Sequence, residues 1–385
     1  MHAQKQSERA TKAGSGQRPV PKANHLSPHG RSPQGVLALQ RMAGNDAVAR
    51  TLTPVQRMVT ATEPAEEVKH IHDFVTELLG AADKLIGEAK GFAWRFKSAP
   101  ARQAHLDKLG QTLDNAEHMV YRQFRDDPGG REDNAKNNGL KELLDAVQKR
   151  HFSYVEILRN SSGTRPVGMD IDADDTEAQD ELSQTWSQVV RGQGIATSEK
   201  PRPVGDDPDP TALPGYGTQM LSAHARLLSR QRGRALVSDL ASPSNAHSPM
   251  VSVVPYHPEV VDAIGKTDLA AQADSNSMPD ARAASVDRPS AGSSTTVTAP
   301  HDFKDSEGAK PGEAVSPFFL LYGHELIHAQ HNKHGINVAA FDDEETATVS
   351  GIESSKLLHA GKGLRVTTED QLRDEHYMPR RGGYT

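Results

Sequence analysis

The sequence predicts an α+β fold in which a helical region and a mixed domain follow a basic N-terminal arm. Between about residues 61 and 165, apolar residues recur every three and four positions, which is the period of amphipathic helices. After residue 216, segments rich in β-branched residues alternate with apolar helical segments. Residues 1–60 are basic and contain frequent Gly, Ser and Pro, a composition that does not support a packed core.

Composition favours a modest folded part beside long solvated segments. Hydrophobic residues make up 35% of the 385 residues, and there are 31 Gly and 24 Pro. Because the chain has no cysteine, disulfides, iron–sulfur clusters and thiolate zinc sites are excluded, and any metal must be held by His and carboxylate side chains. The net charge of −7 gives no support for a nucleic-acid partner, and no apolar run is long enough to span a membrane.

Residues 1–60 are expected to form a basic arm without a fixed structure. The arm carries nine Lys and Arg residues against only Glu8 and Asp46. Within it, the stretch GVLALQRMAGNDAVARTL has apolar residues that allow one short amphipathic piece. Since the N-terminus lacks the apolar core of a secretory signal, we expect any export to use a route without a cleaved signal peptide.

Three helices are expected in the region 61–165. Their apolar positions are Val68, Ile71, Val75, Leu78, Leu79 and Ala82, then Leu106, Leu109, Leu113, Val120 and Phe124, then Leu140, Leu143, Leu144 and Val147. Pro100 and the stretch DDPGG at Asp126–Gly130 separate them. Connections of this kind favour an antiparallel helical bundle.

Residues 166–215 are expected to be an acidic, Pro-rich linker. The run from Asp170 to Glu181 places acids at positions one, three, five and twelve of a calcium-binding loop. Asp175 stands where that loop needs a glycine for its sharp turn, and no amphipathic helix leads into the run. A solvated acidic run is therefore the preferred interpretation, and a calcium site is the alternative.

The remaining residues, 216–385, are expected to form the mixed domain. QMLSAHARLLSR predicts a helix, and the β-branched segments PMVSVVPYH and SSTTVTA predict strands. The polar stretch between the two strands, about residues 265–291, is expected to be a long loop.

The stretch SPFFLLYGHELIHAQHNKHG predicts a buried helix that carries a metal site. Ser316 and Pro317 suit the start of a helix, and Gly335 suits its end. His324 and His328 are four residues apart, so their imidazoles project from one face, one turn apart. A single Zn²⁺ can accept both rings.

Glu325 completes the H-E-x-x-H pattern of zinc peptidases. Next to the first histidine, its carboxylate can take a proton from a water at the metal. The five-residue pattern also occurs by chance in helices. Two histidines and a glutamate in an apolar helix, however, need partners to offset their desolvation. We therefore expect a site for one Zn²⁺, with Glu325 as its catalytic base.

Two interpretations of the third protein ligand remain open. His334 lies six residues after His328, which is the spacing of a three-histidine pattern. That pattern needs a glycine where this chain has His331, so a helix that continues through His331 would turn His334 away. The alternative is a carboxylate from a following helix, for which FDDEETATVSG offers Glu345, seventeen residues after His328.

The stretch HELIHAQHNKHG followed by EETATVSG resembles the zinc peptidase light chains of clostridial neurotoxins. It resembles still more the NleD-type effector metallopeptidases that pathogenic bacteria inject into host cells. The resemblance covers about Pro249–Thr385 and implies a zincin-like (gluzincin) fold for this domain. It also implies that Glu345 is the third zinc ligand and that Glu344 orients a ligand histidine.

The last residues, TTEDQLRDEHYMPRRGGYT, resemble the closing segment of the same family, in which an Arg and a Tyr in an R-x-x-Y spacing face the zinc. Arg381 and Tyr384 hold that spacing here, and Arg380 is the alternative arginine. The resemblance implies that these side chains stabilise the oxyanion of the tetrahedral intermediate. Upstream, AGSSTTVTAP resembles the strand that precedes the metal helix, where an exposed edge can hold an extended substrate by strand addition.

Within the arm, VLALQRMAGNDAVARTL resembles the leaders of toxins carried by extracellular contractile injection systems. The resemblances together imply a zinc metalloendopeptidase toxin or effector, loaded into an injection particle through residues 1–57. They imply that it is exported without a cleaved signal peptide and cleaves a host protein in the target-cell cytosol. The alternatives are a housekeeping zinc peptidase with a disordered tail, and a structural injection-system component with a relict site.

Overall fold

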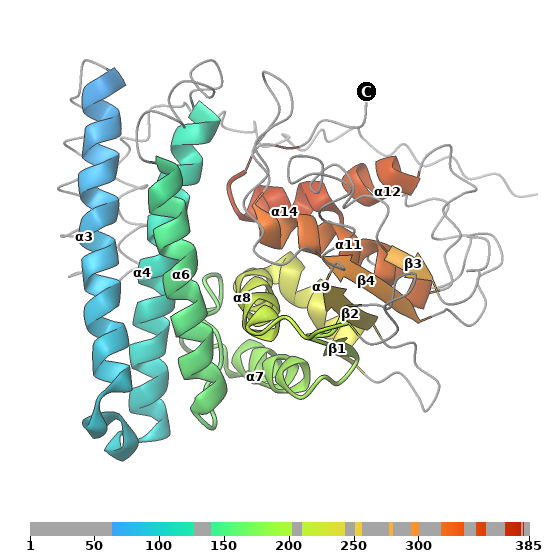
Figure 1. The fold of residues 1–385 in the computed structure, drawn as a ribbon, viewed down its shortest axis with the longest axis horizontal. Helices are drawn as coiled ribbons and strands as arrows, with labels where there is room; N and C mark the ends of the chain where they lie inside the picture. The colour runs from blue at the N-terminus through green and yellow to red at the C-terminus, as the bar shows by residue number, and fades with distance from the viewer. Residues whose placement is uncertain are drawn as a thin grey trace, which may run out of the picture. The chain divides into compact units, whose positions relative to one another are not determined.

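The computed structural model describes residues 64–126, 140–201, 210–242, 251–255, 277–279, 294–299, 317–334, 344–351, 366–378 and 380. All of these residues belong to one compact unit that begins at Thr60. The predicted arm at residues 1–60, with its leader-like stretch, lies outside the described residues. The described part combines helices with one small, mainly parallel sheet, so the α+β fold class is confirmed (Figure 1).

Three long helices lie where the apolar spacing predicts them: α3 (Pro64–Lys90), α4 (Ala99–Asp126) and α6 (Leu140–Asn160). They pack against one another side by side (Figure 1). The 3₁₀ turn η1 (Phe92–Phe96) joins α3 to α4. The buried residues of the three helices include Ile71, Val75, Leu79, Leu106, Leu109, Leu113, Val120, Leu143 and Val147. Burial of this apolar stripe is what holds the helices together.

The region 166–215 contains regular structure, which differs from the predicted linker. Helix α7 (Thr176–Val190) and strand β1 (Ile195–Thr197) both lie in it. One side of α7 is a buried stripe made by Leu182, Trp186 and Val189. The acidic residues of the helix are exposed. Acidic residues are as common on the solvated faces of helices as in linkers. The acidic composition of this region therefore could not distinguish a linker from an amphipathic helix.

The acidic run in this region serves the fold. The Asp175 side chain caps α7 by accepting a hydrogen bond from a backbone N–H of its first turn at 3.0 Å. Asp170, the first position of the calcium-loop pattern, pairs with Arg234 at 2.6 Å. Glu181, the twelfth position, accepts a hydrogen bond from a serine hydroxyl. Both partners belong to α9 (Gln231–Ala241), so the two ends of the calcium pattern are engaged by the protein itself.

Four described strands form a sheet in the order β1-β2-β4-β3. Strand β2 (Val251–Pro255) runs parallel to β1 and to β4 (Thr295–Ala299), whereas β3 (Ser277–Pro279) is antiparallel to β4. Both predicted strand segments are therefore strands. Because β4 has a neighbour on each side, the exposed edge predicted at AGSSTTVTAP is wrong, and the edges of the described sheet are β1 and β3.

The remaining helices surround a central one. Helix α11 (Phe318–Lys333) contacts α8 (Tyr216–Leu228), α9, α12 (Glu344–Ser350), α14 (Glu369–Glu375) and strands β3 and β4. The predicted metal helix therefore lies within the core of this part of the chain. Of the helices that the structure describes, none is long and apolar enough to cross a membrane.

Candidate metal centre

Helix α11 is covered on nearly every side. Only Leu321 and Asn332 along its length are partly exposed. The predicted end signals Ser316 and Gly335 lie outside the described residues. Since the neighbours of α11 exclude water, the polar side chains on this helix need partners within the protein.

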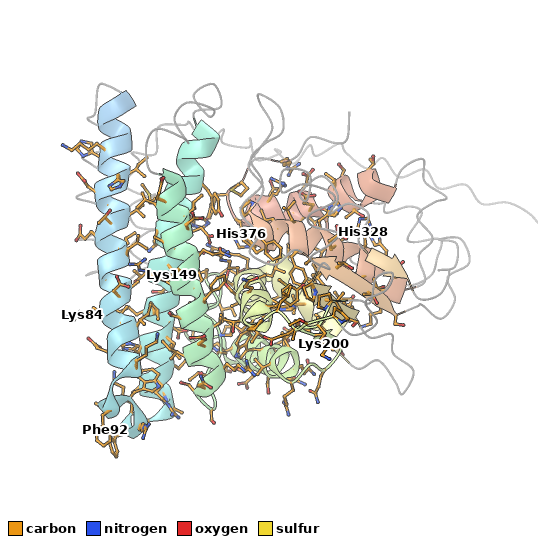
Figure 2. The ribbon with its side chains drawn as sticks, viewed as in Figure 1. Lys84, Phe92, Lys149, Lys200, His328 and His376 are labelled. Carbon is orange, nitrogen blue, oxygen red and sulfur yellow. The ribbon has the colours of Figure 1, made fainter. Side chains whose placement is uncertain are left out.

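His324 and His328 bring their Nε2 atoms to 3.1 Å from each other (His328 is labelled in Figure 2). Both rings are buried, with exposed fractions of 1% and 7%. Two ligands of a tetrahedral zinc ion with Zn–N bonds of about 2.0–2.1 Å lie about 3.3 Å apart. At this distance either one ring donates its Nε2–H to the other, or both nitrogens direct their lone pairs at a cation between them. The pair therefore fits two ligands of one metal ion.

The Nδ1 side of the His324 ring contacts a buried ion pair between Glu369 and Arg373. Its Nδ1–H donates to Oε2 of Glu369 at 2.8 Å, and Oε1 of Glu369 accepts a hydrogen bond from Nε of Arg373 at 2.5 Å. Both charged side chains are fully buried. A carboxylate on Nδ1–H fixes the tautomer that leaves the Nε2 lone pair for a metal. Glu369 thus fixes the orientation of the His324 ring, and sequence reasoning missed this residue.

Two features place α14 close to His324: a capping box at the start of α14 and a glycine on α11 that lies against it. Thr368 and Gln371 form a capping box that starts α14 one residue before Glu369. Gly323 lies against the Leu372 side chain, which a Cβ at position 323 would approach to 2.9 Å. A larger residue at 323 would therefore force the Leu372 side chain to move, so glycine allows the close approach of α14 to α11. The capping box is a signal that sequence reasoning had available for placing this helix.

His328 also has a contact on its second ring nitrogen. The Oγ1 of Thr348 lies 3.2 Å from Nδ1 of His328, and Thr348 is completely buried. Positions 344 and 345 come one turn earlier in the same helix, α12. The side chains of Glu344 and Glu345 lie outside the described residues, so their roles as orienting acid and third ligand stay predictions.

Of the other predicted catalytic residues, the structure describes Glu325 and Arg380 but not Arg381 or Tyr384. Glu325 is buried, with 3% of its surface exposed. Arg381 and Tyr384 lie outside the described residues. Arg380 is exposed and forms an ion pair with Asp374 at 2.6 Å. Across the described ranges, no group of three or more His, Cys, Asp or Glu side chains is arranged to hold a metal ion.

The alternative ligand His334 contacts a different helix. Because α11 continues through His331, His334 follows its last turn. The Nε2–H of His334 donates to Oδ2 of Asp239 at 2.7 Å, and the Gln330 side-chain amide donates to the same oxygen at 2.7 Å. Lys333 also pairs with Asp239. In this structure, then, His334 helps to tie the end of α11 to α9.

The Asp239→Asn variant is expected to be less stable than the wild type by about 2 kcal/mol at pH 7. Burial raises the pKa of Asp239, but the contacts with His334, Gln330 and Lys333 outweigh burial and lower the pKa from 3.8 to about 2. Since the folded state favours the ionised carboxylate, the stabilisation is present above about pH 4 and is lost as the pH falls through 2. Urea unfolding at pH 7 and about pH 3 measures both effects, and equal stabilities at pH 7 would contradict the prediction.

The described part of the site thus offers two buried imidazoles whose second nitrogens contact Glu369 and Thr348, with the buried carboxylate of Glu325 next to them in the helix. Groups of these types are suited to hold a divalent metal and to move a proton. Comparisons of the chain with protein-family models, with curated proteins and with solved structures found no match.

Proposed function

We propose that the chain is a zinc-dependent metalloendopeptidase with a zincin-like, gluzincin-type domain in residues 216–385. One observation carries the proposal: His324 and His328, buried and one helical turn apart, direct their Nε2 atoms at each other at 3.1 Å. The second nitrogen of each ring contacts a buried polar side chain, Oε2 of Glu369 for His324 and Oγ1 of Thr348 for His328, which is how the ligand histidines of a metal site are oriented. The H-E-x-x-H and E-E motifs and the resemblance to NleD-type effector metallopeptidases add support.

His324, His328 and Glu345 would hold the zinc ion. A zinc ion at such ligands polarises a peptide carbonyl and lowers the pKa of water toward neutrality. Glu325 would take the proton from that water and deliver it to the leaving amine. The proposed oxyanion donors, Arg381 and Tyr384, follow α14 in the chain.

We also propose that the enzyme is a toxin or effector that acts in the target-cell cytosol after delivery by an injection particle. Its support is the resemblance of the N-terminal stretch VLALQRMAGNDAVARTL to injection-system leaders. Loss of particle loading when residues 1–57 are deleted would distinguish this role from that of a housekeeping peptidase.

Wild-type protein is expected to bind one zinc ion, and the Glu345→Ala variant is expected to bind none under the same purification. The carboxylate supplies the third protein ligand, without which two histidines hold zinc weakly. His334→Ala should keep the metal, because His334 contacts Asp239. Elemental analysis of the three proteins measures this directly.

The matched pair of variants separates the two ligand sets. Loss of zinc in His334→Ala alone would establish a three-histidine site and contradict the proposed ligand set. Zinc retained in both variants would show that neither residue is a ligand.

A further inference from the structure

The turn between α3 and α4 presents two aromatic rings to solvent. Phe92 and Phe96 are 75% and 74% exposed, and their ring centroids lie 5.1 Å apart in an edge-to-face arrangement. Within the described ranges, the only other exposed large hydrophobic side chain is Tyr377, at 57%. Figure 2 shows Phe92 at the very end of the helical hairpin, pointing away from it. Adjacent exposed aromatic rings of this kind mark a contact surface.

The turn is anchored by Trp94, and this anchoring keeps the two phenylalanine rings exposed. Trp94, between them in the sequence, is buried, and its Nε1–H donates to Oγ of Ser161 at 3.2 Å. The Trp94 ring also packs edge-to-face on His105, with centroids 5.2 Å apart. With Trp94 fixed inward, the 3₁₀ turn holds Phe92 and Phe96 outward.

Basic residues outnumber acidic ones in the sequence on either side of the two rings. Residues 84–102 contain one acidic side chain, Glu88, and five basic ones: Lys84, Lys90, Arg95, Lys97 and Arg102. The acidic residue just before this segment, Asp83, pairs with Arg150 at 2.6 Å. We call residues 84–102 the hairpin tip. Its charge favours an anionic partner.

Two other occupants fit this surface less well. Two aromatic side chains bury about 150–250 Å² each, whereas a stable protein–protein interface buries about 1,200–2,000 Å² in total. A second copy of the tip would also bring like charges together. The sequence of residues 1–60 is basic as well, so its charge does not complement that of the tip.

We propose that the hairpin tip docks on an anionic lipid surface, with Phe92 and Phe96 placed at the level of the lipid headgroups. Aromatic rings flanked by Lys and Arg are the side-chain combination that binds the membrane interface, because the rings enter the headgroup region while the cations attract anionic lipids. Two rings are enough for a weak, reversible contact. The proposal is independent of the peptidase chemistry.

The absence of cysteine from the chain allows a label to be placed on the tip alone. Ala93→Cys, between the two phenylalanines, carries an environment-sensitive dye in the full-length protein, and Ser183→Cys, exposed on α7, is the matched control. We expect the dye at position 93 to shift to the blue with vesicles of phosphatidylcholine and phosphatidylserine but not with phosphatidylcholine alone. The dye at position 183 should not respond to either.

Two sets of substitutions in the labelled protein test the rings and the charges separately. Phe92→Ser with Phe96→Ser should weaken vesicle binding by on the order of tenfold or more. Changing Lys84, Lys90 and Arg95 to Gln should weaken it by on the order of a hundredfold at low salt. Removing three exposed charges elsewhere, by Lys149→Gln, Lys200→Gln and Arg232→Gln, should have a far smaller effect. Thermal unfolding checks that each variant is folded.

Three outcomes would overturn the proposal. Vesicle binding that is unchanged by both tip variants would place lipid contact elsewhere in the chain. A dye shift without vesicles that grows with protein concentration would identify a second copy as the occupant. A shift of the same size with soluble polyglutamate would identify an acidic polypeptide in place of a lipid surface.

Discussion

Replacing Glu369 with alanine is expected to lower zinc affinity by about 10–100-fold and to destabilise the folded protein by about 3–5 kcal/mol. The first effect follows from the hydrogen bond between Nδ1 of His324 and Oε2 of Glu369, because without it the ring loses its fixed tautomer and orientation. The second follows from Arg373, which is fully buried and would keep its charge after losing its ion pair with Glu369. Zinc titration and urea unfolding of the metal-free protein measure the two effects separately.

The two effects of this variant can be separated with a second substitution. Replacing Arg373 with Met in the Glu369→Ala background removes the buried charge that lost its ion pair, so stability should largely recover while zinc affinity stays low. Asp374→Ala on the same helix is the matched control, since its ion pair with Arg380 is exposed to solvent and contributes little to stability. Wild-type zinc affinity in Glu369→Ala would show that the ion pair serves only the packing of α14.

The parts of this molecule that were predictable from sequence are those that depend on neighbouring residues. The period of Ile71, Val75 and Leu79 predicts a helix because each turn buries its own residues. His324 and His328 share one face of α11 for the same local reason. Their approach to 3.1 Å depends in addition on the ring orientations, which the contacts with Glu369 and Thr348 hold.

The parts that were missed depend on contacts between distant segments. Glu369 contacts His324 across 45 residues of chain, and no spacing rule links those two positions. The wrong edge assignment for β4 has the same origin, since its neighbours β2 and β3 come from separate segments. The helix at Thr176–Val190 is a different case: its apolar stripe is present in the sequence, but the surrounding acids led to its interpretation as a linker.

Glu325→Gln is expected to lower peptidase activity by about 10²–10⁴-fold while zinc remains bound. Glutamine keeps the shape of the side chain but cannot take a proton from water. Since glutamine has nearly the same size and shape as glutamate, the buried side chain should keep its packing, and the variant should still unfold cooperatively on heating. Zinc content and thermal unfolding therefore serve as internal controls for this variant.

The activity itself can be measured on a whole cell extract, which offers the enzyme many proteins at once. The extract is incubated with each protein, and new peptide N-termini are identified by mass spectrometry. New N-termini that appear with the wild type and not with Glu325→Gln establish a peptidase that uses this carboxylate as its base. Equal sets of N-termini would assign the base to another residue. If zinc-loaded wild type produced no new N-termini from the extract of any target cell, the metal would have only a structural role, and the chain would then belong with the non-catalytic components of an injection system.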